Sequence, residues 1–421
     1  MQCAASSSAR RSGWRLAASV CVLAAAVVLL AGPLTLRGQG RSDEVRALWV
    51  ARTSLVSPSS ISAMIQSAKV NRFNTLLVQV RARGDAYFND GVEPRATSLA
   101  GQPDAFDPLQ STLAEAHAAG LRVHAWINVA LVASAVDLPA SRSHVIYGHP
   151  EWLMVPRAIA EEMALLDPRS RLYVDKLARW VRGQNTEVEG LYLSPIPQAA
   201  ADYTVAVVSD LVARYPVDGV HLDYARYPTD DFDYSREALA AFGADEAASL
   251  PASETRRLQQ RARSDSFAFT DAAPDRWRAF RRDRFTALVR RLKDAVRLWR
   301  PDALVTAAVY PDAADAATRR LQDWRVWLNN GSVDVVCPMA YATDAPTFTA
   351  QMTSARAGAG DRPLWAGIGA YRLTSSQTIE NIQIARRLGA DGIVLFSYDS
   401  LTSAPNGLEY LAQVGQVAFA R

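Results

Sequence analysis

The sequence predicts a (β/α)8 barrel, in which eight parallel strands alternate with helices. After residue 42 the chain alternates short apolar runs with amphipathic segments eight times, and the apolar runs are nearly continuous. Such runs are typical of strands buried on both faces, and the strand–helix order indicates a parallel sheet. No glycine-rich phosphate loop follows an early strand, which argues against a doubly wound nucleotide-binding sheet. Neither half visibly repeats the other, so we expect one domain over residues 44–420.

The expected strands are rich in valine, leucine, isoleucine and aromatic residues, which suit buried extended backbone. In chain order they are residues 46–52, 75–81, 122–129, 220–224, 304–310, 333–341, 364–371 and 392–398. The expected helices place apolar residues three or four positions apart, so that one face can pack on a core. They are residues 57–72, 107–120, 199–215, 276–299, 321–330, 347–357, 375–388 and 408–418.

Two of these helices need comment. Asp107 is a suitable N-cap, and Gly120 a suitable stop, for the helix between them. The helix over 276–299 is strongly basic, and basic amphipathic helices can bind membranes. Its apolar stripe is more simply explained as a face that packs on the core.

Two long insertions interrupt the alternation, after the third and fourth strands. Residues 130–198 are irregular in pattern. Residues 229–275 are charged and alanine-rich, with local helices expected over 235–248 and 254–263. Insertions of this length between core elements usually serve as lids or binding loops.

The first forty residues have the order of an export signal. Three arginines precede an apolar run over 16–34, and small residues precede a possible cut after Gly40. The run is also long enough for an uncleaved membrane anchor. In either case we expect export to the periplasm, the cell envelope or the medium, with membrane contact only through this segment.

The charge balance outside the leader argues against nucleic-acid binding. The chain carries a net charge of +3, and four of its 46 basic residues lie in the first forty. The remaining 42 basic and 43 acidic residues nearly cancel, so no basic surface is implied. Cys337 is the one cysteine outside the leader, in an apolar run that predicts a buried thiol.

Several kinds of chemistry lack their sequence signal. No HExxH, CxxC or closely spaced histidine–aspartate cluster is present, so we expect no metal or other cofactor. The GxSxG motif of serine hydrolases is absent too. His124 and His221 fall on strands, and each is more simply a structural histidine of a barrel than a ligand.

The stretch VDGVHLDYARYP, residues 217–228, combines a strand with a group of functional side chains. Because side chains alternate along a strand, His221 and Asp223 share one face. A carboxylate at the end of a buried strand is costly unless it is paired or used. Asp223 therefore either forms an ion pair with Arg226 or acts in a site, and in the second case His221 and Arg226 beside it are expected to contact substrate.

Polar and aromatic residues gather at the carboxyl ends of the expected strands, where barrel active sites lie. Carboxylates beside aromatic rings suit glycoside hydrolysis, which needs an acid and a base or nucleophile. Asp223 is the first catalytic candidate and Asp344 its expected partner. Asp85, Asp312 and Asp399 rank behind Asp344. Each of these four aspartates also suits a turn or helix cap, and for Asp312 and Asp399 that explanation is favoured. The aromatic residues expected to line sugar subsites are Trp126, Tyr341, Tyr371 and Tyr398.

The same strand ends resemble a known family. The matching segments are RALWVARTSL (46–55), FNTLLVQVRARGDAYF (73–88), HAWINV (124–129), PEWLM (150–154), LYLSP (191–195), VDGVHLDYARYP (217–228), VDVVCPMAYATD (333–344), GIGAY (367–371) and GIVLFSYDSL (392–401). Over about residues 44–418 the chain resembles the glycosyl-hydrolase-like family ten proteins, which have a TIM-barrel fold.

This resemblance implies an exported hydrolase that acts on a polysaccharide, with bacterial cell-wall glycan as a candidate. It implies Arg81, Asp85, Asn128 and Tyr341 as site residues beside Asp223. The insertion at 229–275 departs from the family pattern. Two alternatives stay open: a non-catalytic carbohydrate-binding barrel, and an envelope scaffold in which the insertion binds a protein. The first gains weight if no two rim carboxylates lie within about 5–10 Å of each other.

Overall fold

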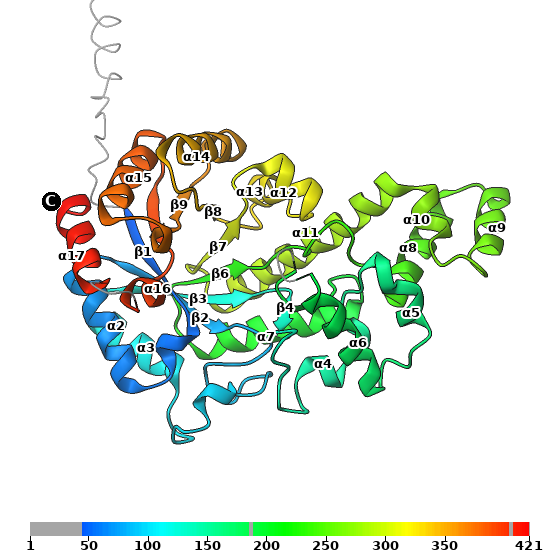
Figure 1. The fold of residues 1–421 in the computed structure, drawn as a ribbon, viewed down its shortest axis with the longest axis horizontal. Coiled ribbons are helices and arrows are strands. Elements are labelled where there is room, and N and C mark those ends of the chain that lie inside the picture. The colour runs from blue at the N-terminus through cyan, green and yellow to red at the C-terminus, as the bar shows by residue number, and fades with distance from the viewer. Residues whose placement is uncertain (1–43, 185–187, 404–406, 421) are drawn as a thin grey trace, which may run out of the picture. The chain divides into compact units, whose positions relative to one another are not determined.

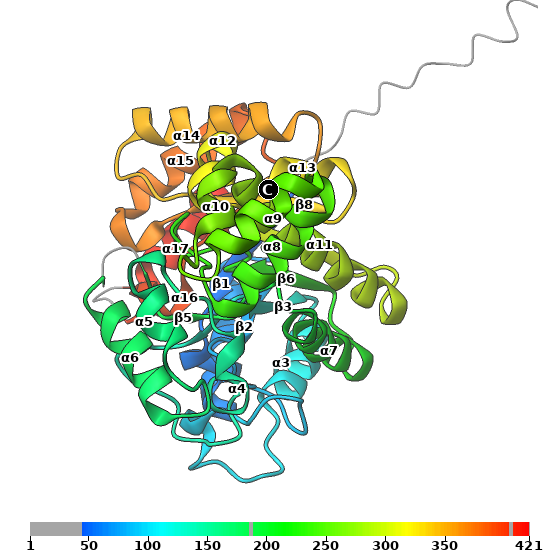
Figure 2. The same cartoon turned by 90° about the vertical axis from the view of Figure 1, so that its right-hand side faces the viewer.

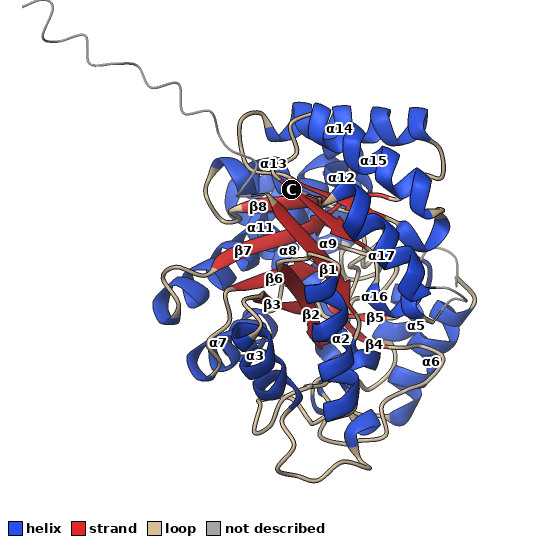
Figure 3. Cartoon of the chain, turned by 90° about the vertical axis from the view of Figure 1, so that its left-hand side faces the viewer, coloured by secondary structure: helices blue, strands red, loops and turns tan. Residues whose placement is uncertain are grey.

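Eight parallel strands close into a barrel in the computed structural model, which describes residues 44–184, 188–403 and 407–420. The strands are β1 (Val45–Val50), β2 (Thr75–Arg81), β3 (Arg122–Asn128), β6 (Gly219–Asp223), β7 (Leu304–Val309), β8 (Val335–Ala340), β9 (Trp365–Ile368) and β10 (Gly392–Leu395). Neighbours around the barrel follow one another in the chain, and β10 closes the ring on β1, with Val45 opposite Gly392. The predicted (β/α)8 barrel is confirmed, and Figure 3 shows its helices around the strands.

The side chains of the strands divide into two layers. Inside the barrel, Trp49, Trp126 and Trp365 pack with Cys337 and smaller residues into one apolar cluster. The outward side chains join the helices in a second, larger cluster. Inner and outer residues alternate along each strand, as the pleat requires. Cys337 is fully buried, and burial raises the pKa of its thiol.

Eight of the surrounding helices agree with the predicted ones within a few residues, and the two over residues 313–319 and 398–402 were not predicted. The surrounding helices are α2 (Pro58–Val70), α3 (Pro108–Ala118), α7 (Gln198–Arg214), α11 (Pro274–Trp299), α12 (Ala313–Arg319), α13 (Trp324–Asn329), α14 (Ala345–Ala359), α15 (Ser375–Arg387), α16 (Tyr398–Thr402) and α17 (Gly407–Ala418). Asp107 caps α3 by accepting the Gln110 N–H at 2.9 Å. The apolar stripe of α11, which includes Phe285, Leu288 and Leu292, is buried, so this face packs on the core as expected.

The insertion between β3 and α7 is more regular than its pattern predicts. It holds a two-stranded antiparallel sheet of β4 (Leu131–Ala133) and β5 (Leu191–Tyr192), and the helices α4 (Val145–Gly148), α5 (Ala160–Ala164) and α6 (Arg171–Arg182). The expectation of an irregular segment was wrong for α6, whose buried residues Tyr173, Val174 and Leu177 follow a helical period.

The second insertion forms the helices α8 (Arg236–Ser249), α9 (Ala252–Arg261) and α10 (Ala268–Ala272). Both predicted helices of this segment are present. Figures 1 and 2 show the two insertions on the same side of the barrel, the side toward which β3 and β6 point. The short 3-10 turns are η2 (Arg52–Leu55), η3 (Thr97–Leu99), η4 (Pro150–Trp152), η5 (Arg157–Ile159) and η6 (Ala370–Arg372).

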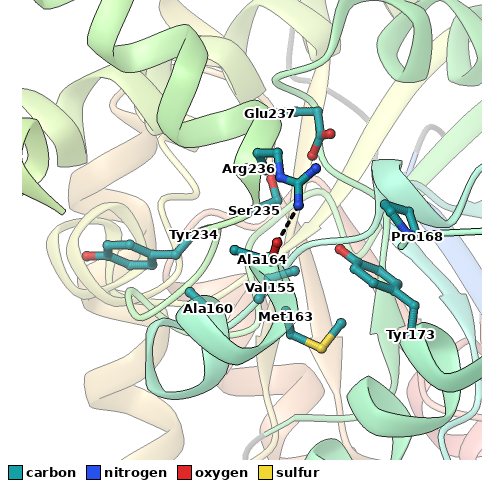
Figure 4. Close-up of a pocket in the computed structure, with 10 residues that line it drawn as sticks. All are labelled: Val155, Ala160, Met163, Ala164, Pro168, Tyr173, Tyr234, Ser235, Arg236 and Glu237. Carbon is teal, nitrogen blue, oxygen red and sulfur yellow. Dashed lines mark hydrogen bonds between the residues drawn. The ribbon is translucent and has the colours of Figure 1, made fainter. Parts of the chain in front are cut away.

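The two insertions pack directly on each other. The carboxylate of Asp233, which is fully buried, accepts the Val155 N–H at 2.9 Å, and the guanidinium of Arg236 donates to the Ala164 carbonyl. Figure 4 shows the hydrogen bond between Arg236 and Ala164 among residues of both insertions. These residues surround a void of about 10 Å³. A void of that size holds about one water molecule, so it is a packing gap and has no room for a sugar.

The leader and its expected boundary at residue 40 lie outside the described residues. Within the described ranges, no helix combines the length and the apolar character needed to cross a bilayer.

Candidate active site

Asp223 is the last residue of β6 and lies at the carboxyl-terminal rim, opposite Asn128 of β3. Its side chain points inward with that of His221, as the alternation predicts. One carboxylate oxygen accepts the Tyr224 N–H at 2.7 Å. Tyr224 has a φ of +49°, a left-handed backbone that is unusual for a tyrosine and turns the chain sharply after Asp223. Such backbone is common at functional sites.

Asp223 is 7% exposed as a residue, and burial raises the pKa of its carboxyl. Arg226 and the Tyr224 N–H oppose that increase, because both stabilise the ionised form. Arg226 Nη1 lies 3.7 Å from the nearer Asp223 oxygen, an ion pair too long to be a hydrogen bond. The ion pair expected from the sequence is thus present. Because it is not a hydrogen bond, it leaves the Asp223 carboxylate able to bond a substrate. A buried carboxyl with a raised pKa is suited to act as a general acid.

A second carboxylate, Glu189, reaches the same arginine. Glu189 Oε1 lies 3.0 Å from Arg226 Nη2, and its other oxygen accepts the Tyr192 hydroxyl at 2.6 Å. Since the planar guanidinium is about 2.3 Å wide between these nitrogens, the nearer oxygens of Glu189 and Asp223 are at most about 9 Å apart. Glu189 also contributes to the raised pKa of Asp223. The two carboxyls therefore lie within the range of catalytic pairs.

Glu189 was not among the predicted site residues, because it lies in the first insertion. One local signal was Gly190, which directly follows it. A Cβ at Gly190 would lie 2.1 Å from the Ala133 carbonyl oxygen, so only glycine permits this approach of β5 to β4. The Glu189 carboxylate is thus held beside a close contact between the backbones of β5 and β4.

Three aromatic rings form the floor beside Asp223. Tyr341 follows β8, Phe396 follows β10, and Tyr371 lies in η6. Their centroids are 5.5 Å (Tyr341–Phe396), 5.9 Å (Tyr371–Phe396) and 6.3 Å (Tyr341–Tyr371) apart. Trp126 is 4% exposed and lies under this floor, 6.3 Å from Phe396. Tyr371, with 48% of its surface exposed, is the ring most open to a ligand.

Phe396, and not Tyr398, completes this floor. Along β10, Val394 points into the barrel and Leu395 outward, so Phe396 points inward again. The chain then leaves the strand at Ser397 and begins α16, which places Tyr398 in the outer apolar layer. Tyr398 is 7% exposed there, so the structure does not support it as a sugar contact.

Arg81 and His221 are buried, and their side chains form hydrogen bonds with other groups of the protein. Arg81 is 1% exposed; its guanidinium forms two hydrogen bonds with Glu93, at 2.6 and 2.7 Å, and donates to the carbonyls of Asn128 and Val129. His221 is fully buried: its Nε2 accepts the Trp49 indole N–H at 2.9 Å, and its Nδ1 lies 2.8 Å from the Thr306 hydroxyl. Burial lowers the pKa of His221 to about 3. The expected substrate contacts of these two residues are replaced by structural ones.

Asn128 positions the rim. Its amide donates to the Ala82 carbonyl at 2.6 Å, and its oxygen accepts the Trp126 indole N–H at 3.1 Å. Gln79 donates to the same oxygen at 3.4 Å. Asn128 is 3% exposed, so it holds the ends of β2 and β3 in place beside Asp223.

The other predicted carboxylates serve local structure. Asp344 is exposed and caps α14 by accepting the Thr347 N–H at 2.8 Å. This bond is the main reason that the pKa of Asp344 is lowered. In the described residues no ion pair or hydrogen bond links it to Asp223. Asp312 caps α12, and Asp399 accepts hydrogen bonds from Ser54 and its neighbours.

Asp85 is half-buried and accepts the Arg83 N–H at 2.9 Å, as a turn aspartate does. Among the described residues, no group of three or more histidine, cysteine, aspartate or glutamate side chains lies close enough to hold a metal ion.

Comparison with known proteins identifies the family. The family model described as Glycosyl hydrolase-like 10 matches residues 44–368. The chain is 26% identical over 207 residues to Glycosyl hydrolase DigH of Escherichia coli strain K12, which covers 44% of this chain and 42% of that protein. It is 22% identical over 330 residues to Glycosyl hydrolase YngK of Bacillus subtilis strain 168, covering 71% and 54%. The chain thus spans about half the length of these relatives.

Solved structures confirm the fold. The PgaB (BpsB) glycoside hydrolase domain from Bordetella bronchiseptica superimposes with a TM-score of 0.61 at 18% identity, covering 89% of this chain and 99% of that one. A beta-galactosidase from Bacillus circulans sp. alkalophilus gives a TM-score of 0.60 at 12% identity, covering 89% and 56%. The resemblance predicted from the strand ends is confirmed, and the chain belongs to the glycosyl hydrolase-like 10 family.

Proposed function

We propose that this protein is a glycoside hydrolase that cleaves O-glycosidic bonds in a polysaccharide. The observation that carries the proposal is the pairing of Asp223 with Glu189, two carboxylates at most about 9 Å apart beside an aromatic floor. Asp223 is the general acid, since burial raises its pKa and keeps the proton to higher pH. Glu189, with 37% of its side chain exposed, is the partner that acts as base or nucleophile.

In this mechanism the Asp223 proton passes to the glycosidic oxygen as the bond to the leaving sugar breaks. Positive charge then develops on the ring that stays, and the Glu189 carboxylate stabilises it or activates a water. Arg226 holds both carboxylates in place through its two terminal nitrogens. Tyr371 and Tyr341 offer ring faces for stacking of sugars.

Two features of the sequence support bacterial cell-wall glycan as the polysaccharide. The leader, with its arginines and its apolar run over 16–34, has the order of an export segment, and the family resemblance implies the same substrate class. Export to the envelope places the protein where that glycan lies. N-terminal sequencing of the mature protein tests cleavage after Gly40, whereas an intact N-terminus in the membrane fraction indicates an anchor.

The decisive experiment measures release of reducing ends from a glycan panel that includes peptidoglycan strands. We expect Asp223→Asn and Glu189→Gln each to lose at least about 100-fold in kcat/KM, the size typical of general acid–base catalysis. Asp344→Asn is the matched control and should keep wild-type activity, because its carboxylate only caps a helix.

The same assay separates the hydrolase from a non-catalytic carbohydrate-binding barrel. Activity that survives Asp223→Asn unchanged would contradict the role of Asp223. Binding of glycan by the wild-type protein without any cleavage would favour the binding barrel.

A further inference from the structure

Arg320, a cation next to the proposed site, has no carboxylate partner among residues 44–184, 188–403 and 407–420. It directly follows α12, in the loop after β7. Its guanidinium carbon lies 5.3 Å from the ring centroid of Tyr310, the residue after β7. Within the described ranges, no ion pair and no side-chain hydrogen bond involves Arg320, and its Nη1 is buried without an acceptor. A buried donor without an acceptor is costly, so this nitrogen is a candidate for ligand contact.

The main chain around Arg320 is fixed against the catalytic loop. The Arg320 carbonyl accepts the Tyr227 N–H at 3.0 Å. Gln322, which is fully buried, accepts the Tyr310 N–H at 2.9 Å and donates to the Ala308 carbonyl at 3.2 Å. These bonds hold Arg320 and Tyr310 beside the segment that carries Arg226.

Arg226 contacts the same tyrosine ring. Its guanidinium carbon lies 5.3 Å from the Tyr310 centroid and 4.2 Å from the Tyr224 centroid. Arg226 is 4% exposed, and its Nε and Nη1 are buried without a hydrogen-bond acceptor in the described chain. Two guanidinium groups therefore share one ring, and three of their nitrogens lack an acceptor.

The charges around Tyr310 leave a positive excess. Arg226 is paired with Glu189 at 3.0 Å and with Asp223 at 3.7 Å, whereas Arg320 has no anionic partner in the described residues. In the working enzyme Asp223 carries a proton as general acid. Glu189 then balances one of the two arginines, and one positive charge is left. A monoanion bound by the second arginine would balance it, and guanidinium groups bind carboxylates through paired hydrogen bonds.

We infer that Arg320, Tyr310 and Arg226 form a subsite for a carboxylate on the sugar next to the cleaved bond. The substrate class is a glycan with one carboxylate per repeat, carried as a uronic acid or as a lactyl ether. This inference rests on the proposed function, because the subsite adjoins Asp223. It deepens that function by assigning a charge to the substrate.

The test compares one glycan in two forms, with its carboxylates intact or reduced to hydroxymethyl groups. The intact forms are a uronic-acid oligosaccharide in one arm and a lactyl-bearing peptidoglycan strand in the other. Calorimetry on the Asp223→Asn protein measures binding without turnover, and wild-type kcat/KM measures cleavage. We expect at least about 10-fold preference for the intact form in one arm, the size of one hydrogen bond to a charged group.

Arg320→Gln should remove that preference by raising KM for the intact glycan toward the value for the reduced glycan. Arg319→Gln is the matched control, since Arg319 is exposed and pairs with Asp315 at 2.9 Å in α12. It should keep the preference. Equal affinity of wild type for both forms in both arms overturns the inference, and so does a preference that persists in Arg320→Gln.

Failure of the proposed function looks different. If neither form is cleaved but the intact form binds more tightly in an Arg320-dependent manner, the subsite stands and the hydrolase fails. If the glycans are cleaved without preference, the hydrolase stands and the subsite fails. The comparison of the two glycans on wild type needs no variant, so it is decisive even if Arg320→Gln folds poorly.

Discussion

Replacement of Arg226 by methionine tests the electrostatic basis of the proposed catalysis. Arg226 Nη1 lies 3.7 Å from Asp223, and both side chains are almost fully buried, with 5% and 11% of their surfaces exposed. At this separation an effective dielectric constant of about 20 gives an interaction of roughly 4 kcal/mol. That is an upper bound equivalent to roughly three pKa units. Arg226→Met should therefore raise the pKa of Asp223 further.

The pH profile of kcat/KM reports this change. Asp223 must be protonated to act as acid, so the rate falls as the pH rises through its pKa, and in Arg226→Met this alkaline limb moves to higher pH. We expect a displacement of about one to three pH units.

Arg226→Lys keeps the positive charge and is the control, since it should move the alkaline limb by less than half as much. The comparison also separates the loss of charge from the loss of packing against Tyr224. If the profiles of Arg226→Met and wild type superimpose, Asp223 is not the group whose protonation limits the rate.

Three further predictions follow from the reassigned residues. Arg81→Met should lower the free energy of unfolding by about 3–5 kcal/mol in chemical denaturation, because it leaves Glu93 buried without its cation; a stable variant with a raised KM would instead restore Arg81 as a substrate contact. Asp223→Asn should raise the melting temperature at pH 7 and have no effect below about pH 3. The pKa of Asp223 is higher in the folded than in the unfolded protein, so the wild-type fold loses stability as the pH rises from the unfolded-state value through the folded-state value. Equal melting temperatures of the two proteins at pH 7 would contradict this. Gly190→Ala leaves both carboxylate residues in the sequence but should reduce kcat at least 10-fold. The added Cβ would push β5 away from β4 and so displace Glu189. A wild-type kcat in this variant would show that the position of Glu189 is not critical.

The fold was predictable because each barrel strand carries its own signal. Runs such as 75–81 are buried on both faces, and their order with helices leaves few alternatives to a parallel barrel. That Asp223 and His221 share one face of their strand followed from alternation alone. The first insertion was harder to predict, since α6 has a helical pattern within a segment rich in proline, arginine and acids.

The site was predictable only where it lies on strands. Asp223 and Tyr341 follow from strand ends, but the partner carboxylate follows from a loop that folds over the rim. Asp344 looked suitable because it closely follows a strand, yet an aspartate two residues before a proline and just before a helical pattern is also an N-cap. The prediction that Tyr398 lines a sugar subsite failed for a related reason. Side chains alternate only as far as the strand extends, and β10 ends at Leu395, three residues before Tyr398.

The arrangement divides the proposed reaction between two kinds of structure. The acid, Asp223, is fixed by β6 and by the turn at Tyr224, both continuous with the barrel. Its partner, Glu189, is fixed by β5 and by the Arg226 guanidinium that it shares with Asp223. The distance between the two carboxylates decides whether a water fits between the base and the sugar. In the proposed pairing the first insertion, more than the barrel, therefore sets the stereochemical course. Changes in that insertion can therefore alter the outcome of the reaction while the barrel and Asp223 stay the same.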